Sequence, residues 1–263
     1  MITNELTDPL LEGVIHIAKE AGGLIMEIYQ DQQGFAIKAD GSPVTLADEI
    51  ANDYIIEALA LLSPGVPIIS EESSPLEAKF ISSEPFWLVD PLDGTKEFIN
   101  KNGEFTVNIA LIKDGRPYLG VVFAPALQTL YAGIVSEGAL MIDDVGIRKA
   151  IRCKHVPELA EILISRSHTS TELNHSHYQQ FSKQFLLKPC GSSLKFCLIA
   201  SGQADIYPRL GRTMEWDTAA AHAILCAAGG TVKTLSGEPL LYGKGGFENP
   251  HFVARGLDPV HLI

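Results

Sequence analysis

Two aspartates three residues apart are the residues of this chain best placed to do chemistry. Asp90 and Asp93 stand in the run Asp90-Pro91-Leu92-Asp93-Gly94-Thr95, directly after the apolar run 86–89. The apolar run predicts a buried strand, so the carboxylates come at a strand's end, where oxygen ligands of a hard divalent cation can converge. Asp, Pro and Gly are also the usual residues of a turn, so the motif alone is compatible with either interpretation.

Other acids favour the metal site. Glu71 and Glu72 end a second short apolar run, 66–70, and Asp217 lies far downstream in the run EWDTAA, which starts at Glu215. Each has a structural alternative, because Glu72 suits a solvated loop and Asp217 suits the N-cap of a helix predicted over 216–228. Several acids that follow predicted strands or begin predicted helices would nevertheless serve one common centre.

Asp48 allows two interpretations as well. The run 45–48, Thr-Leu-Ala-Asp, resembles a capping box with Asp in place of Glu, at the start of a helix predicted over 45–62. A carboxylate that caps a helix can also accept a hydrogen bond from a hydroxyl elsewhere. Asp48 is therefore a candidate for both a structural and a catalytic role.

Composition limits the kind of partner. The chain has 263 residues, 46% of them hydrophobic, and a net charge of −12. Such a charge argues against a nucleic-acid polymer, whose binding depends on Lys and Arg, but leaves a small phosphorylated substrate bridged by metal ions. The four cysteines have no CxxC spacing, no apolar run reaches bilayer length and the start of the chain lacks a basic segment, so we expect a cytoplasmic protein with reduced thiols and no cleaved export signal.

The elements that must position these residues fall into two groups. Apolar spacing predicts helices over 9–30 and 45–62 and then strands over 66–70, 86–90, 105–113, 118–124 and 129–135, with antiparallel neighbours. Shorter elements follow: strands over 161–165, 184–188, 204–207 and 231–234, and helices near 171–182, 192–201 and 216–228. We therefore expect an N-terminal α+β half, 1–150, with most of the metal ligands, and a C-terminal α/β half, 151–263, with Asp217.

These motifs together resemble the inositol monophosphatase-like superfamily, and within it the bacterial 3'(2'),5'-bisphosphate nucleotidase branch. The acidic motifs carry the superfamily, and KEFI, NGEFTVNIAL, GSSLKFC and IYPRLG carry the branch. The resemblance implies a mixed α+β fold, a layered αβαβα sandwich. Its matching segments are DGSPVTLAD at 40–48, SEESS at 70–74, WLVDPLDGTKEF at 87–98, NGEFTVNIAL at 102–111, GSSLKFCLIASGQADIYPRLG at 191–211 and EWDTAAAHAIL at 215–225.

The resemblance also implies roles for the acids. Glu71, Asp90 and the carbonyl of Leu92 would hold one Mg²⁺, and Asp90, Asp93 and Asp217 a second, in a site for two or three ions. Thr95, paired with Asp48, would orient the attacking water, unless Thr95 is only an N-cap. Glu72 would orient ligands or water. Backbone amides at Gly94 and Thr95 would hold the scissile phosphate. The resemblance also implies that Glu71, Leu92, Asp93 and Asp217 contact the substrate.

Residues about a hundred positions later would select the substrate. Gly191, Ser192, Lys195 and Arg209 would contact the nucleotide and its second phosphate, although Ser192 also suits a helix cap and Arg209 a surface ion pair. Two positions depart from the family pattern. Ala221 replaces a usual Gly, which would either bring a methyl group to the cleft or be accommodated by packing, and Arg212 replaces a usual Pro, which adds positive charge.

The expected activity is that of a Mg²⁺-dependent phosphomonoesterase that converts 3'-phosphoadenosine 5'-phosphate to AMP and phosphate. Alternatives are an inositol or sugar phosphatase, and, from a different class, a catalytically silent regulator that binds nucleotide or metal. The resemblance leaves a homodimer and peripheral association with the inner face of the membrane possible.

Overall fold

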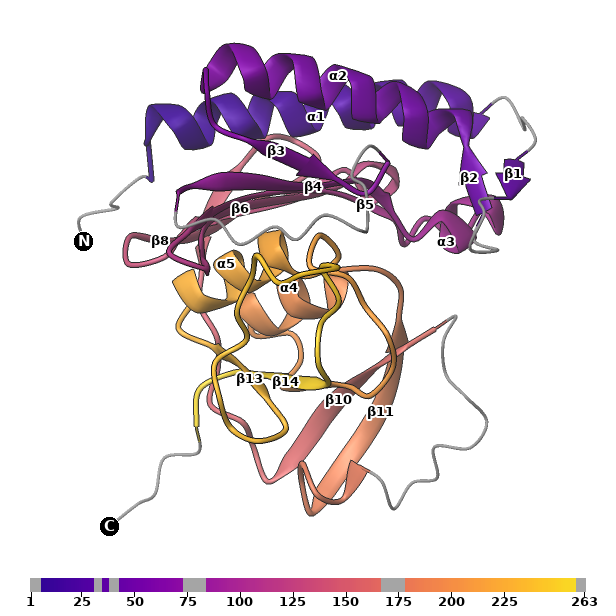
Figure 1. Cartoon of the computed structure of the whole chain (residues 1–263). Helices are drawn as coiled ribbons and strands as arrows, with labels where there is room; N and C mark the ends of the chain where they lie inside the picture. The colour runs from indigo at the N-terminus through magenta and orange to yellow at the C-terminus, as the bar shows by residue number, and fades with distance from the viewer. Residues whose placement is uncertain (1–5, 31–34, 38–42, 73–83, 167–177, 259–263) are drawn as a thin grey trace.

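The computed structural model describes residues 6–30, 35–37, 43–72, 84–166 and 178–258. Helices α1 (Pro9–Gln30) and α2 (Leu46–Leu62) cover one face of a seven-stranded sheet, and α4 (Leu194–Ala200) and α5 (Ala219–Ala227) lie on its other face. A five-stranded sheet lies beyond α4 and α5 (Figure 1). This layering of helices and sheets confirms the predicted α+β fold class.

The seven-stranded sheet explains the long apolar runs of the first half. Trp87 and Val89 face α1 and α2, whereas Phe86 and Leu88 face α4 and α5, so both sides of the strand are buried. β3 pairs with β4 in parallel and all other neighbours are antiparallel. The order across the sheet is β3 (Ile68–Ser70), β4 (Phe86–Asp93), β5 (Thr106–Lys113), β6 (Arg116–Ala124), β7 (Thr129–Ile134), β8 (Gly138–Ile142) and β9 (Arg148–Ile151).

The two N-terminal helices form as predicted. The apolar residues of α1 recur at helical spacing, and those from Leu11 to Ile25 are buried against α2 and the sheet. α2 begins with the predicted capping box: Thr45 is the N-cap, and its backbone N–H donates to Oδ2 of Asp48 over 2.8 Å. No helix among the described residues is long and apolar enough to cross a bilayer.

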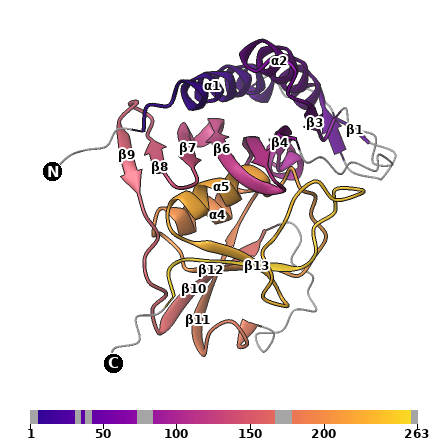
Figure 2. The same ribbon diagram turned by 60° about the vertical axis from the view of Figure 1, so that its left-hand side comes forward.

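The second sheet is mixed and lies across the far side of α4 and α5 (Figure 2). Its order is β11 (Gln184–Cys190), β10 (Leu159–Ser165), β12 (Ile206–Arg209), β14 (Phe252–Arg255) and β13 (Thr231–Thr234). The first sheet ends at Ile151 and the second begins at Leu159, while the predicted division into halves at residue 150 stays a prediction.

Several predicted elements need correction. β8, β9 and β14 were not predicted, nor were the short pieces β1 (Phe35–Ile37), β2 (Pro43–Thr45), α3 (Thr95–Ile99) and the 3-10 turn η1 (Pro125–Leu127). α5 begins at Ala219 rather than at 216. The helix predicted near 171–182 lies mostly outside the described residues, and its described end forms a turn in which the N–H groups of Phe181 and Ser182 donate to the carbonyl of Tyr178.

One glycine sets how closely α5 approaches the first sheet. A Cβ atom built at Gly120 on β6 would lie 2.1 Å from the carbonyl oxygen of Ala220, so no side chain fits between strand and helix there. α5 therefore lies directly on the backbone of β6. All four cysteines are free, as expected, and three of them are buried.

Candidate metal centre

A β-bulge brings Asp90 and Asp93 to the same face of the sheet. Residues three apart on a regular strand point to opposite faces. In β4, however, Asp90 pairs with Asn108 and Asp93 pairs with Thr106, so β4 carries one extra residue between two partners that are two apart. Both aspartates consequently face α4 and α5, as Phe86 and Leu88 do. The residues Asp90–Asp93 of the run DPLDGT therefore belong to a bulged strand and not to a simple turn.

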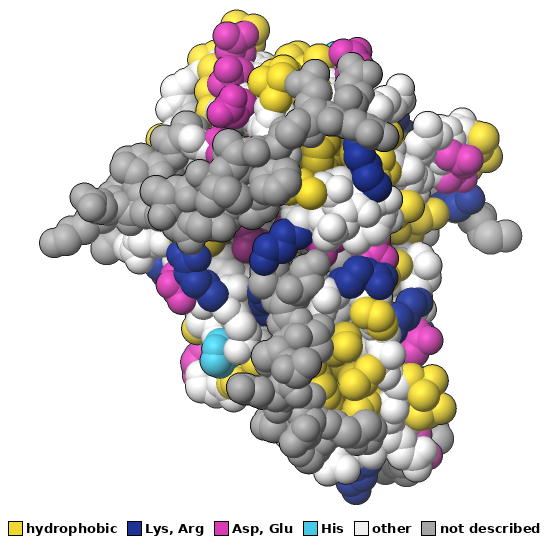
Figure 3. Space-filling view, turned by 90° about the vertical axis from the view of Figure 1, so that its right-hand side faces the viewer, with side chains coloured by type: hydrophobic (Ala, Val, Ile, Leu, Met, Phe, Trp, Pro, Cys, Tyr) yellow, Lys and Arg dark blue, Asp and Glu magenta, His cyan; other side chains and the backbone are white. Residues whose placement is uncertain are grey.

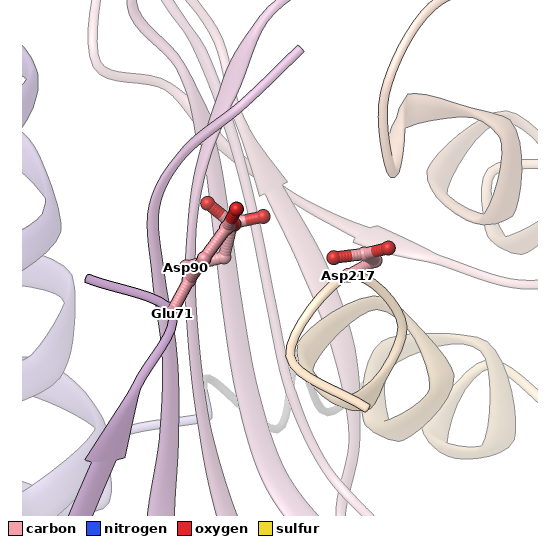
Figure 4. Close-up of side chains that lie close together, drawn as sticks. All are labelled: Glu71, Asp90 and Asp217. Atoms are coloured by element: carbon pink, nitrogen blue, oxygen red, sulfur yellow. The ribbon is translucent and has the colours of Figure 1, made fainter. Parts of the chain in front are cut away.

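Three acids from distant parts of the sequence meet in this region. Glu71 follows β3, Asp90 lies on β4 and Asp217 precedes α5, and each contributes a carboxylate oxygen to a group in which these atoms all lie within 4.8 Å of one another. Glu71 and Asp90 lie side by side, with Asp217 opposite them (Figure 4). The structure therefore brings Glu71, Asp90 and Asp217 together, while their role as metal ligands stays a prediction.

The structure gives Asp217 a different local role from helix capping. Thr218 is the N-cap of α5, and no side chain caps that helix end. The Asp217 carboxylate instead accepts a hydrogen bond from the backbone N–H of Met214 over 2.9 Å through Oδ2. It is thereby held at the end of a short loop rather than turned towards the helix.

A buried glutamate fixes that loop. Glu215 is fully buried and accepts hydrogen bonds from the backbone N–H groups of Gly243, over 2.6 Å, and Lys244, over 2.9 Å. The ammonium group of Lys244 lies 2.6 Å from the same carboxylate. The buried Glu215 carboxylate, whose charge is compensated by these donors, thus fixes the chain two residues before Asp217 to residues 243–244.

Asp93 lies beside this group and not within it. Its Oδ2 accepts a 2.6 Å hydrogen bond from the backbone N–H of Ser193, at the start of α4. Burial raises the pKa of Asp93 to about 6, although the nearby charge of Lys195 and the Ser193 hydrogen bond lower it. Its predicted role as a metal ligand stays a prediction.

Several carboxylates this close together repel one another when all of them are ionised. Burial, and then the negative charges of Glu71 and Asp93, raises the pKa of Asp90 well above its ordinary value. Burial and the same two neighbours also raise the pKa of Asp217. An all-oxygen donor set with excess negative charge is what Mg²⁺ prefers, so the residues present fit a hard divalent cation.

Asp48 serves two groups with two different oxygens. Oδ2 accepts from the N–H and, over 2.7 Å, the hydroxyl of Thr45, while Oδ1 lies 3.3 Å from the hydroxyl oxygen of Thr95. The Thr95 hydroxyl is also 3.4 Å from the carbonyl oxygen of Leu92. Thr95 is not the N-cap of α3, because Gly94 holds that position. The structural and the proposed catalytic interpretation of Asp48 are therefore geometrically compatible.

The group opens into a pocket of about 390 Å³. Of the predicted substrate residues, Leu92, Gly94, Thr95, Ser192, Lys195 and Arg209 line it together with Glu71, Asp93 and Asp217. Gly191 and Glu72 do not line it. On the face in Figure 3, Lys and Arg side chains gather across the middle of the molecule, with Asp and Glu side chains between them.

The cations of the pocket make local contacts. Lys195 is buried, and its ammonium group donates to the carbonyls of Cys190 and Ser192. Arg209 donates to the carbonyls of Gly211 and Arg212 instead of pairing with a surface acid, as its alternative interpretation required.

Glu97, an acid of the pocket, was not identified from the sequence, and the sequence did not decide where the methyl group of Ala221 lies. Glu97 on α3 is buried and lines the pocket, and its only sequence signal is its place in the KEFI run after DPLDGT. Arg212 lines the pocket too. Ala221 is fully buried in the core of α5 and does not line the pocket, so its methyl group is accommodated by packing.

Comparison with known proteins agrees with this geometry. The profile of the inositol monophosphatase family matches residues 6–259. The chain is 47% identical over 247 residues to the 3'(2'),5'-bisphosphate nucleotidase CysQ of Salmonella typhimurium, covering 92% of this chain and 98% of that protein. It is 44% identical to the CysQ of Buchnera aphidicola, covering 97% and 96%. The crystal structure of CysQ from Bacteroides thetaiotaomicron superposes with a TM-score of 0.80 at 36% identity, covering 94% and 96%.

The fold and the site define the class of this protein: it is a layered α+β protein with a partly buried group of carboxylates from Glu71, Asp90 and Asp217. The chain belongs to the inositol monophosphatase family. Enzymes of this family depend on metal ions, generally Mg²⁺.

Proposed function

We propose that this protein is a metal-dependent phosphomonoesterase that hydrolyses 3'-phosphoadenosine 5'-phosphate to AMP and inorganic phosphate. The observation that carries the proposal is the carboxylate group of Glu71, Asp90 and Asp217, which opens into the same pocket as Thr95 and the cations Lys195 and Arg209. The names of the CysQ relatives support the choice of substrate.

Five residues would hold two or three Mg²⁺ ions: Glu71, Asp90, Asp93 and Asp217 through carboxylates and Leu92 through its carbonyl. Bound there, the ions supply Lewis-acid stabilisation of the phosphate oxygens and activation of a water molecule. Asp90 is buried, and the charges of Glu71, Asp93 and Asp217 all act on it, so it would be the ligand shared between ions.

Asp48 and Thr95 would orient the attacking water. With its proton donated to Oδ1 of Asp48, the Thr95 hydroxyl oxygen would accept a hydrogen bond from a water in the pocket that Thr95 lines. A water held this way directs its own lone pair at phosphorus, and Glu72 would support the arrangement from outside the pocket.

Other residues of the pocket would receive the rest of the substrate. Ser192, Lys195 and Arg209 also line the pocket, and their donors suit a nucleotide and the phosphate that is not hydrolysed. Gly191 would contribute through the backbone of the turn that carries Ser192. Homodimer formation and association with the inner face of a membrane remain predictions, which gel filtration and vesicle sedimentation would test.

A phosphate-release panel with Mg²⁺ tests the proposal. The purified protein is offered 3'-phosphoadenosine 5'-phosphate, inositol 1-phosphate and fructose 1,6-bisphosphate, with the Asp90→Asn variant as the control for contaminating phosphatases. We expect the highest kcat/KM for the bisphosphate nucleotide. A preference for the inositol or sugar phosphate would overturn the choice of substrate, and phosphate release from none of them would favour the silent regulator.

A further inference from the structure

A charged pair next to the pocket joins the two sheets. Glu104 lies between α3 and β5, and Arg166 directly follows β10 in the second sheet. The Arg166 Nε donates to Oε2 of Glu104 over 2.8 Å, and a terminal nitrogen of Arg166 donates to Oε1 over 2.7 Å. Burial raises the pKa of Glu104, but the bonds from Arg166 and Gly191 outweigh it and leave the pKa below its ordinary value. Glu104 is therefore a stable anion in a two-point contact.

The same carboxylate holds the turn that enters the pocket. Oε2 of Glu104 also accepts a 2.7 Å hydrogen bond from the backbone N–H of Gly191, and Arg166 donates to the carbonyl of Pro189. A Cβ atom at Gly191 would lie 2.7 Å from the carbonyl oxygen of Glu104, so the turn lies against the first half as closely as its backbone allows. Glu104 and Arg166 thus hold the chain just before Ser192.

Two carboxylates hold alternate amides of this turn. The N–H of Gly191 goes to Glu104 and the N–H of Ser193 goes to Asp93. Ser192 lies between them with a φ of 45°, a left-handed conformation that a serine keeps only when its surroundings enforce it. Its carbonyl accepts from the ammonium group of Lys195 over 2.5 Å. The direction in which Ser192 and Lys195 face the pocket therefore depends on both anchors.

We propose that Glu104 and Arg166 are a positioning pair for substrate: they fix the turn Gly191–Ser193 so that Ser192 and Lys195 meet the part of the phosphorylated substrate that lies away from the carboxylate group. This inference rests on the proposed function of the pocket. Neither side chain lines the pocket, so both act through the turn.

The two anchors predict a specific kinetic pattern. Loss of Glu104 leaves Asp93 still bonded to Ser193, so the acids keep their arrangement while Ser192 can leave its left-handed conformation. Contacts to the non-reacting part of the substrate weaken in the ground state and the transition state alike, which raises KM with little change in kcat. A pair that merely held the two halves together would instead lower the folded, active fraction, and with it the apparent kcat, at constant KM.

The test compares Glu104→Gln and Arg166→Lys with a matched control. Glu12 and Arg148 form a similar two-point pair between α1 and β9, with side-chain exposures of 37% and 39% against 23% and 41% for Glu104 and Arg166. Neither Glu12 nor Arg148 lines the pocket. Steady-state kinetics uses whichever phosphate ester the wild type hydrolyses best, calorimetric titration measures AMP binding, and thermal melting follows stability.

We expect Glu104→Gln to raise KM and the Kd of AMP about tenfold with kcat within about threefold of wild type. Arg166→Lys, which keeps the charge but loses the two-point geometry, should have a smaller effect in the same direction, and Glu12→Gln should have none. Unchanged KM and Kd in Glu104→Gln would overturn the inference, as would an equal rise in Glu12→Gln. A wild type that hydrolyses inositol phosphate in preference to the nucleotide would refute the proposed substrate alone, because the KM comparison would still test the pair.

Discussion

Asp48 offers the sharpest test of the proposed chemistry, because its two carboxylate oxygens serve different purposes. Oδ2 completes the capping box of α2 through Thr45, and Oδ1 receives the hydroxyl of Thr95. The contribution of Asp48 to stability and its contribution to catalysis can therefore be removed by different substitutions. Thr45→Ala breaks the capping box and leaves the Thr95 contact in place, while Thr95→Val removes the hydroxyl and leaves the cap.

Loss of the helix cap is expected to change the stability of the protein, whereas loss of the Asp48–Thr95 contact is expected to change kcat. Loss of a helix cap costs about 1 kcal/mol, which lowers Tm by about 2 °C in a chain of this size. Asp48→Asn can keep one oxygen for the Thr45 amide, but it then offers an amide donor to Thr95, so the Thr95 hydroxyl has to accept from it. One of the two lone pairs of the hydroxyl oxygen is then taken by the amide, and the hydroxyl proton no longer has a carboxylate to go to. The lost proton transfer lowers kcat by roughly 10² to 10⁴, or about 3 to 5 kcal/mol in the barrier.

Thermal melting and Mg²⁺-dependent phosphate release, measured on the same preparations, distinguish the capping role of Asp48 from its catalytic role. Thr45→Ala should melt about 2 °C lower than wild type and keep its kcat, whereas Asp48→Asn and Thr95→Val should lose at least about a hundredfold in kcat. Thr95→Ser, which restores the hydroxyl, should recover most of the rate. The reasoning is refuted if Asp48→Asn melts lower but retains kcat within about threefold of wild type, since Asp48 would then be only a cap.

Three further outcomes follow from the same region. Asp93→Asn should abolish most hydrolysis in a protein with an unchanged circular dichroism spectrum, and wild-type rates would contradict the proposed metal scheme. Glu215→Gln should weaken Mn²⁺ binding, measured by electron paramagnetic resonance, about tenfold by releasing the loop of Asp217, whereas Lys244→Met, which spares both backbone donors, should weaken it less. Burial and then the charge of Arg116 lower the pKa of His222 to about 3, so the unfolded chain binds its proton first and stability falls as pH drops below 6.5, by about 2 kcal/mol at pH 5. Urea unfolding should show a shallower pH dependence in His222→Gln, and an identical slope would contradict this assignment.

The sequence predicted the elements that have strong periodicity. α1 and α2 have an apolar stripe or a capping motif, and β4 to β7 have long apolar runs, so their places followed from local pattern. β9 was not predicted, because it is a polar edge strand of four residues whose pairing is decided by β8 rather than by its own composition. The start of α5 was misplaced for a related reason: the Asp217 carboxylate is occupied by Met214, which no helix-capping rule reveals.

The residues of the candidate site could be selected from the sequence, whereas their arrangement in space could not. Motif spacing brought out Glu71, Asp90, Asp93 and Asp217, but the convergence of Asp90 and Asp93 depends on a bulge that the sequence signals only through Pro91 inside a strand. Gly191 was expected at the substrate, and the structure places it behind Ser192, bonded to Glu104. Such partners lie 87 residues apart, so only the tertiary fold reveals them.

The bare backbone of Gly120 has a consequence for how this site tolerates change. Asp217 directly precedes Thr218, the N-cap of α5, and α5 lies directly on β6, so a contact between two main chains limits how far α5 and Asp217 can move relative to the first sheet. Side chains in a core can change rotamer to absorb a substitution, but a main-chain contact has no such freedom. The spacing of the acids thus depends in part on β6, a strand that supplies none of them, and a side chain at Gly120 would have to push α5 away from the sheet.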